Sequence, residues 1–185
     1  MPHCILFTGH MIDKPGRPSP RFPAAKETAA AEAIRNAVHT AQTAAGAVNI
    51  RGIAAGANGG DILFHEACLA LGIPSELYLG IPIAAFQETS VAAGGPGWIA
   101  RYQRLTEQLP VHILLPDATA EVEDDVWEKA NDWMLRTALA MSGADTTLIA
   151  LWDGKKGDGA GGTQHMVQVV KEHHAKVVII DTLAL

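Results

Sequence analysis

The sequence predicts a three-layer α/β domain, in which helices cover both faces of a mostly parallel sheet of about six strands. Short apolar runs alternate with helix-favouring segments along the whole chain of 185 residues. This alternation is typical of parallel sheets that are buried on both faces. Apolar residues make up 48% of the chain, which at this length allows one substantial core. We therefore expect a single domain over residues 1–185.

Six short apolar runs are expected to form the strands. The first, CILFTG, is ended by Gly9, and the second, NIRGIAAG, leads into a glycine-rich turn. Runs of this length, bounded by turn residues, are consistent with buried strands. The expected strands span about residues 4–8, 49–56, 76–82, 111–116, 146–152 and 176–181.

The segments between these runs favour helices. Residues 24–45 are rich in alanine and carry an apolar stripe that includes Ile34 and Val38. The segment before Gly72 has an apolar face at helical spacing, and glycine commonly ends a helix. Residues 88–98 are expected to form a loop. The expected helices span about residues 24–45, 62–72, 98–109 and 124–143, with one more beginning near Thr163.

Four loops follow the carboxyl ends of expected strands and should meet at one edge of the sheet. Thr8, Gly9 and His10 follow the first strand, and residues 56–61, 80–82 and 153–162 follow the second, third and fifth. Ligands of parallel α/β sheets bind at this edge. The loops therefore predict a ligand-binding cleft, although glycines that merely serve tight turns are the alternative explanation.

The glycine-rich segment 152–167 nearly contains a phosphate-binding P-loop. Gly157 and Gly162 have the required spacing and Thr163 follows, but the pattern needs a lysine between Gly162 and Thr163. This excludes a Walker-type nucleotide hydrolase. A helix that begins near Thr163 would still direct free N–H groups and its positive dipole end into the loop, which favours an anion such as phosphate. An empty surface loop is the alternative.

Several polar side chains near these loops have two interpretations. Arg17 and Arg21 would clamp a phosphate or serve only solubility. His165 would contact a ligand or lie solvated at a helix start. Asp153 and Asp158 would bind ribose, act as acid or base, or cap the turn.

The expected helix over 124–143 and the histidines add little to the site. Trp127, Trp133 and Met134 recur at helical spacing, which favours the core. Asn131 would reach a base or ribose, or face solvent. His65 and Glu66 alone do not make a metal site, and we expect no metal and no cofactor.

Charge and composition exclude several classes of protein. The net charge of −6 argues against general nucleic-acid binding. No apolar run reaches membrane length, and the N-terminus lacks a signal sequence. Cys4 and Cys68 lie in apolar runs and are expected to be buried thiols, which together indicate a cytoplasmic protein. The apolar content is compatible with a homodimer.

Two blocks of sequence resemble a known superfamily. GANGGDILFHEACLALGI resembles the G-x-D-x-x-A-H-x-x-A-L-x-x-G segment of the DNA-processing A proteins. NDWMLRTALAMSGADTTLIALWDGKKGDGAGGTQHMVQVV is similar to a block of the YpsA-like proteins and to the P-G-G-x-G-T-x-x-E loop of the Lonely Guy phosphoribohydrolases. All of these belong to the SLOG superfamily of Rossmann-like, nucleotide-binding domains. The resemblance covers most of the chain, and it implies that ligand phosphate and ribose contact Gly9, Gly59, Gly60, Asp61, Gly161, Gly162 and Thr163.

One departure from the family bears on catalysis. In the phosphoribohydrolases a glutamate follows the glycine-threonine turn, whereas here Gln164, His165, Met166 and Val167 follow Thr163. A glycosidic transition state needs a nearby carboxylate. The resemblance therefore implies binding or sensing of a nucleotide or nucleotide-derived ligand. The alternative is an N-glycosidase or deoxyribosyltransferase that uses Asp158 or Asp61, and a third hypothesis is an interaction protein with an empty cleft.

Overall fold

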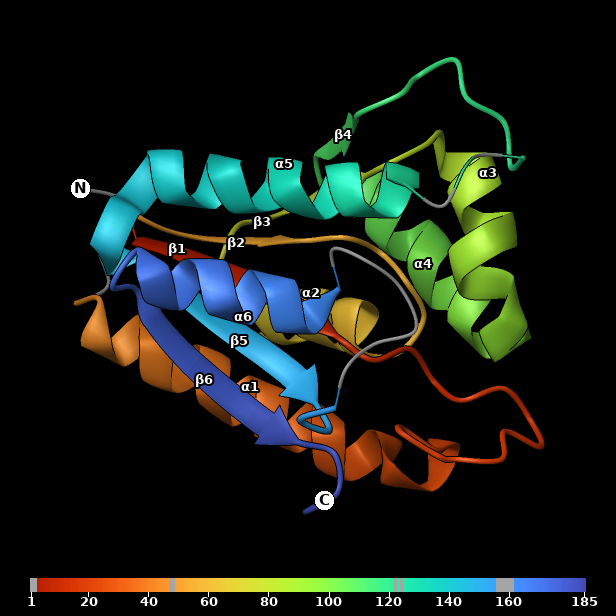
Figure 1. Ribbon diagram of the computed structural model, residues 1–185, viewed down its shortest axis with the longest axis horizontal. Helices are drawn as coiled ribbons and strands as arrows, with labels where there is room; N and C mark the ends of the chain where they lie inside the picture. The colour runs from red at the N-terminus through yellow and green to blue at the C-terminus, as the bar shows by residue number, and fades with distance from the viewer. Residues whose placement is uncertain (1–2, 47–48, 122, 124, 156–161) are drawn as a thin grey trace.

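The fold is built on one parallel sheet of six strands, in the order β4-β3-β2-β1-β5-β6 (Figure 1). The computed structural model describes residues 3–46, 49–121, 123, 125–155 and 162–185. Every neighbouring pair of strands is parallel. The predicted three-layer α/β architecture is therefore confirmed. The strands are β1 (His3–Gly9), β2 (Ile50–Ala54), β3 (Ser75–Leu79), β4 (Val111–Ile113), β5 (Thr147–Trp152) and β6 (Lys176–Asp181).

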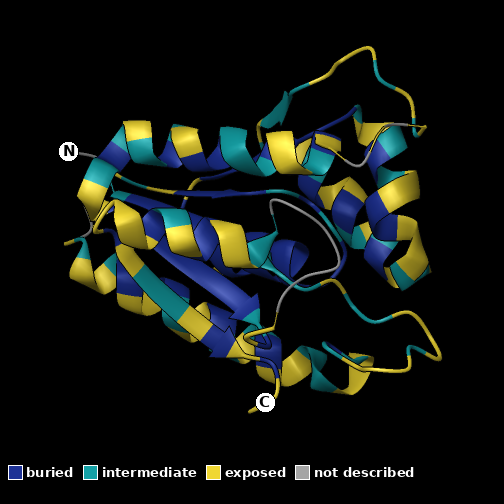
Figure 2. Ribbon diagram, viewed as in Figure 1, coloured by how far each residue is buried: buried dark blue, intermediate teal, exposed yellow. Residues whose placement is uncertain are grey.

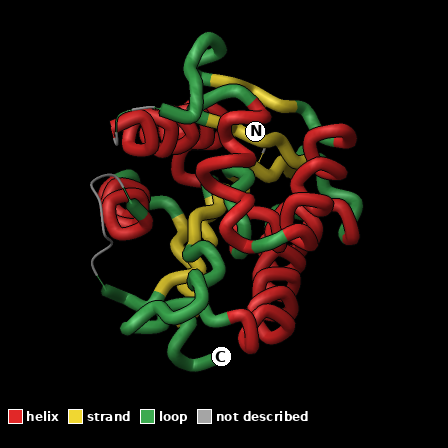
Figure 3. The backbone as a smooth tube through the Cα atoms, turned by 90° about the vertical axis from the view of Figure 1, so that its right-hand side faces the viewer, coloured by secondary structure: helices red, strands yellow, loops and turns green. Residues whose placement is uncertain are grey.

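Helices cover both faces of the sheet (Figures 1 and 3). The helices α1 (Glu27–Ala44), α2 (Gly60–Ala70) and α4 (Pro96–Gln108) pack on one face. The helices α5 (Asp125–Ser142) and α6 (Thr163–Glu172) pack on the other. Within the described residues, no helix combines the length and the apolar character needed to cross a membrane.

The core lies on either side of the sheet and includes the neighbouring interior strands β1 and β5. Their residues are almost entirely buried, while β6 at the edge is partly exposed (Figure 2). On the α1–α2 face, Phe7 of β1 stacks on Phe64 of α2 with ring centroids 5.0 Å apart. Burial on both faces explains why these strands are continuous apolar runs.

The expected loop over 88–98 is largely wrong, because residues 83–94 are helical. A short α3 (Ile83–Phe86) continues into a π-helical turn over Gln87–Val91 and a 3-10 turn over Ala92–Gly94. Phe86 and Val91 are buried, and this apolar spacing of five residues matches a π-helical turn. The glycines that suggested a loop mark only its end, where Gly95 has a φ of +96°.

Candidate functional site

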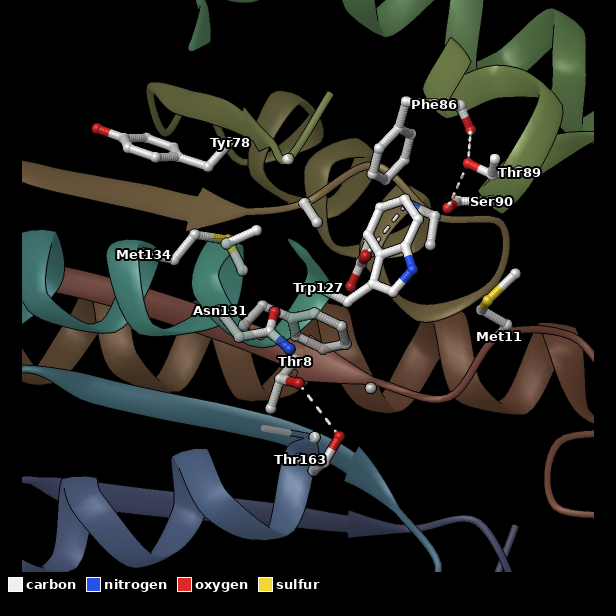
Figure 4. A pocket seen from close by; sticks show the side chains of 18 of the residues that line it. Thr8, Met11, Tyr78, Phe86, Thr89, Ser90, Trp127, Asn131, Met134 and Thr163 are labelled. Carbon is white, nitrogen blue, oxygen red and sulfur yellow. Dashed lines mark hydrogen bonds between the residues drawn. The ribbon is translucent and has the colours of Figure 1, made fainter. Parts of the chain in front are cut away.

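The loops after β1, β2 and β3 and the described ends of the segment after β5, residues 153–155 and Gly162, lie at the carboxyl edge of the sheet. The chain leaves β1 towards β2 and later returns to its other side as β5, so the strand order reverses there. A cavity of about 470 Å³, here called the main cavity, opens at this edge (Figure 4). It is lined by residues from β1, the segment after β2, the start of α2, β3, α3 and the π-helical turn after it, α5 and the start of α6. Among them are Thr8, Gly9, Met11, Asp61, Phe86, Trp127, Asn131, Met134, Gly162 and Thr163.

One end of the main cavity presents hydroxyl groups. Thr8 near the end of β1 and Thr163 at the start of α6 lie with their side-chain oxygens 3.1 Å apart. Gly162 precedes α6, which begins at Thr163, so the helix directs its N-terminal turn towards this end. The N–H groups and dipole of such a turn favour negative charge. This end can therefore hold an anionic group.

The other end of the main cavity is aromatic. Phe86 of α3 and Trp127 of α5 meet edge to face, with ring centroids 5.9 Å apart and an interplanar angle of 75°. Asn131 lies one helical turn after Trp127, between that ring and Thr8 in the view of Figure 4. An aromatic surface beside polar groups is suited to a flat, partly polar ring such as a nucleobase.

Asp61 supplies a buried carboxyl group to the wall of the main cavity. It lies in the first turn of α2, and its Oδ2 accepts a hydrogen bond of 3.1 Å from the N–H of Ala57. Burial raises the pKa of Asp61 to about 7, although the hydrogen bond from Ala57 opposes this shift. A carboxyl group with this pKa can donate or accept a proton near neutral pH.

A second cavity adjoins the first and is here called the loop cavity. It has a volume of about 500 Å³ and is lined by residues 9–17 and Arg21. The two cavities share Gly9 and Met11. The proline-rich loop after β1 therefore extends the site beyond the hydroxyl end of the main cavity.

Asp153 holds this loop against the end of β5. Its side chain is only 1% exposed, with Oδ1 lying 3.1 Å from Nε2 of His10 and Oδ2 lying 3.5 Å from Nε of Arg21. Burial would raise the pKa of Asp153, but hydrogen bonds from Lys155 N–H and His10 outweigh it and lower the pKa. Burial lowers the pKa of His10. Asp153 thus fixes the positions of His10 and Arg21.

Two further side chains fix the same segment. Asp13 accepts hydrogen bonds from the backbone N–H groups of Arg21 (2.8 Å) and Phe22 (2.9 Å), and Phe22 is fully buried. Asn58 accepts a hydrogen bond from the N–H of Ile12 and donates to the carbonyl of Ser90. The loop is therefore tied both to itself and to the π-helical turn over the main cavity.

The structure brings most of the predicted site residues together. Thr163, Gly162 and Asp61 line the main cavity, Gly9 lines both cavities, and the loop cavity adds His10, Arg17 and Arg21. Asp158 and Gly161 lie outside the described residues.

Four predicted residues lie elsewhere. Asp153 is buried beneath the loop and lines neither cavity. His165 is exposed in a separate hollow with acidic residues of α5. A Cβ at Gly59 would lie 2.7 Å from the backbone nitrogen of Ile12, and one at Gly60 would lie 3.0 Å from the ring of Phe7. Both glycines therefore permit close packing of the chain on itself and are not in the walls of the two cavities.

Sequence reasoning missed the residues of the aromatic end. The helical spacing predicts a core position for Trp127, which does pack against the core but also lines the main cavity. Met11, Phe86, Thr89 and Ser90 also line this cavity and were not predicted as site residues. A signal existed on α5, where Trp127, Ala130, Asn131 and Met134 follow helical spacing and form one wall. That spacing alone does not separate a cavity wall from a core face.

No known protein family matches the sequence, and no curated protein matches it significantly. Membership of the SLOG superfamily therefore stays a prediction, and the chemistry of the site rests on the residues of this chain.

Proposed function

We propose that this protein binds a nucleotide or nucleotide-derived small molecule in the main cavity and acts as a ligand sensor of the SLOG type. The observation that carries the proposal is the division of one cavity of about 470 Å³ into a hydroxyl end and an aromatic end. Cavities of this size enclose ligands as large as a nucleotide. The switch in strand order is where parallel α/β domains bind such ligands.

The two ends suit the two ends of a nucleotide. The hydroxyls of Thr8 and Thr163 and the first turn of α6 would bind the phosphate. Trp127 and Phe86 would contact the base, while Asn131 lies between the two ends. Binding in this way would involve only non-covalent contacts and no catalytic residue.

Replacing Trp127 with alanine is expected to weaken nucleotide binding by about tenfold or more, since stacking of one base on an aromatic ring contributes roughly 1–3 kcal/mol. The matched control is Trp133→Ala. Trp133 is on the same helix but packs on Tyr78, with ring centroids 4.7 Å apart, and does not line the main cavity. Isothermal titration of both variants checks the prediction. Equal losses in the two would show that the indole of Trp127 has no specific role.

The direct test is a thermal-shift screen of mononucleotides, dinucleotides, cyclic nucleotides and nucleotide sugars. A ligand that binds the native state raises the melting temperature. Any nucleotide that does so is then incubated with the protein and analysed by chromatography. Recovery of the intact ligand supports a sensor, whereas the absence of any shift would refute nucleotide binding.

Asp61 favours one alternative function, an N-glycosidase or deoxyribosyltransferase. Its carboxyl group lines the main cavity with a pKa of about 7, so it would protonate a departing base or, when ionised, stabilise positive charge on the ribose. The protein would then release free base in the chromatographic test. Asp61→Asn should abolish this release while leaving nucleotide binding intact.

A further inference from the structure

We propose that the loop cavity is a second anion subsite of the same ligand, and that the ligand is therefore a nucleoside 5′-diphosphate or a derivative linked through a diphosphate. This inference rests on the proposed nucleotide binding in the main cavity. It adds the class of nucleotide, because a monophosphate would leave the loop cavity empty.

The main cavity and the loop cavity adjoin each other. They have similar volumes, about 470 and about 500 Å³, and both include Gly9 and Met11 in their walls. Gly9 directly follows Thr8, so the shared boundary begins beside the hydroxyl end of the main cavity, and it extends from there to Met11 on the side of Trp127 (Figure 4). A ligand with its first phosphate near Thr8 and Thr163 would extend its next group into the loop cavity.

The walls of the loop cavity carry more positive than negative side chains. Its walls contain three cationic side chains, Lys14, Arg17 and Arg21, and one carboxylate, Asp13. These four groups sum to +2, and to +1 when the buried Asp153 that pairs with Arg21 is included, whereas the chain as a whole carries −6. A local positive charge on an acidic protein attracts an anion, and the guanidinium fork of arginine matches phosphate oxygens.

The carboxylate of Asp13 has a structural role that explains its presence beside these cations. Its Oδ2 accepts the N–H groups of Arg21 and Phe22, while its Oδ1 lies 3.6 Å from Nε of Arg17. Arg17 also donates a hydrogen bond of 3.0 Å from Nε to the carbonyl of Ser19. Asp13 thus shapes the turn that presents the arginines.

The loop cavity is also organised in advance of any ligand. Arg21 is paired with the buried Asp153, and Phe22 anchors the end of the loop in the core. Because the segment is already ordered, an anion would bind without the cost of ordering a flexible loop. Preorganisation distinguishes this site from a chance collection of surface cations.

The test compares matched 5′-mono- and 5′-diphosphates of adenosine, guanosine, cytidine and uridine by isothermal titration. The proposal expects the diphosphate of at least one nucleoside to bind about tenfold more tightly than its monophosphate, with a preference that decreases as salt increases. In the Lys14→Ala/Arg17→Ala variant this preference should disappear while the monophosphate affinity stays. Lys14 is exposed and the Arg17 side chain is 35% exposed, and the ion pair between Arg21 and the buried Asp153 involves neither residue.

The control variant is Arg35→Ala/Lys129→Ala, which removes two positive charges from exposed positions on α1 and α5. It should keep the full preference for the diphosphate. If diphosphates bind no more tightly than monophosphates, or if the preference survives in the loop variant, this inference is wrong and the proposed nucleotide binding stands. If no nucleotide of either class binds, both proposals are wrong.

Discussion

Replacing Asp61 with asparagine is expected to stabilise the protein at pH 8 by on the order of 4 kcal/mol and to have little effect near pH 4. Burial raises the pKa of Asp61 from its ordinary value of 3.8 to about 7. Ionising this group is therefore less favourable in the folded protein than in the unfolded chain. Asparagine has nearly the same shape, and its amide oxygen can still accept the hydrogen bond from Ala57.

The direction of the pH dependence follows from proton binding. Between about pH 4 and pH 7 the folded state holds a proton on Asp61 that the unfolded state has lost. The Asp61 group in the wild-type protein accordingly destabilises the fold progressively as the pH rises through this window. Below it, the group is protonated in both states and contributes no pH dependence.

Urea unfolding of the wild type and the variant at pH 4, 6 and 8 measures this effect. The control is Asp117→Asn, which removes an exposed carboxylate from the loop after β4 and should change stability by less than about 0.5 kcal/mol. An Asp61→Asn effect that is equal at all three pH values would contradict a raised pKa. A confirmed effect would identify the group in the main cavity that is poised for acid–base chemistry.

The layered fold could be predicted because its signals are local. Continuous apolar runs such as CILFTG and TTLIALW identify buried interior strands, and the helices between them follow from composition and periodicity. The strand order 4-3-2-1-5-6 was not predicted, since the alternation of elements does not determine which strands become neighbours. The helical turns over 83–94 were not predicted, and their buried residues Phe86 and Val91 lack the three- or four-residue spacing of an α-helix.

The hydroxyl end of the site was also predictable, whereas the aromatic end was not. Thr8 lies beside a glycine at the end of β1, and Thr163 lies beside a glycine at the start of the helix that follows β5. A general rule of parallel sheets brings these two positions to the same edge. Phe86 and Trp127 come from segments about forty residues apart in sequence, with no turn motif beside them. Their contact depends on the packing of the start of α5 against α3, which only the tertiary structure shows.

The anchoring role of Asp153 could not be predicted from the sequence. Its position after β5 predicts a ligand contact, whereas in the structure its oxygens lie against His10 and Arg21 and it lines neither cavity. A sequence pattern identifies an acidic residue at a strand end and does not distinguish a ligand contact from a support for the neighbouring loop. The pairing partners are more than 130 residues away in the chain.

Replacing Gly59 with alanine is expected to destabilise the fold by at least about 3 kcal/mol, because two unfavourable effects combine. Gly59 has a φ of +93° and a ψ of −126°, a conformation open essentially only to glycine. A Cβ there would also lie 2.7 Å from the nitrogen of Ile12 and 2.9 Å from the carbonyl oxygen of His10. Both contacts are with backbone, so relief requires the loop after β1 to move.

That movement makes this variant informative about the site as well as the fold. The same loop is tied to α2 by the hydrogen bond from Gly60 N–H to the His10 carbonyl, and it carries the cationic residues of the loop cavity. Denaturant unfolding should be compared with Gly97→Ala, since a Cβ at Gly97 on α4 meets no atom within 4 Å and alanine favours the helix. Gly97→Ala should be neutral or stabilising. If Gly59→Ala changed the free energy of unfolding as little as Gly97→Ala, the backbone at the start of α2 would have a different conformation from the one described. The close packing of the loop after β1 against α2 would then be wrong.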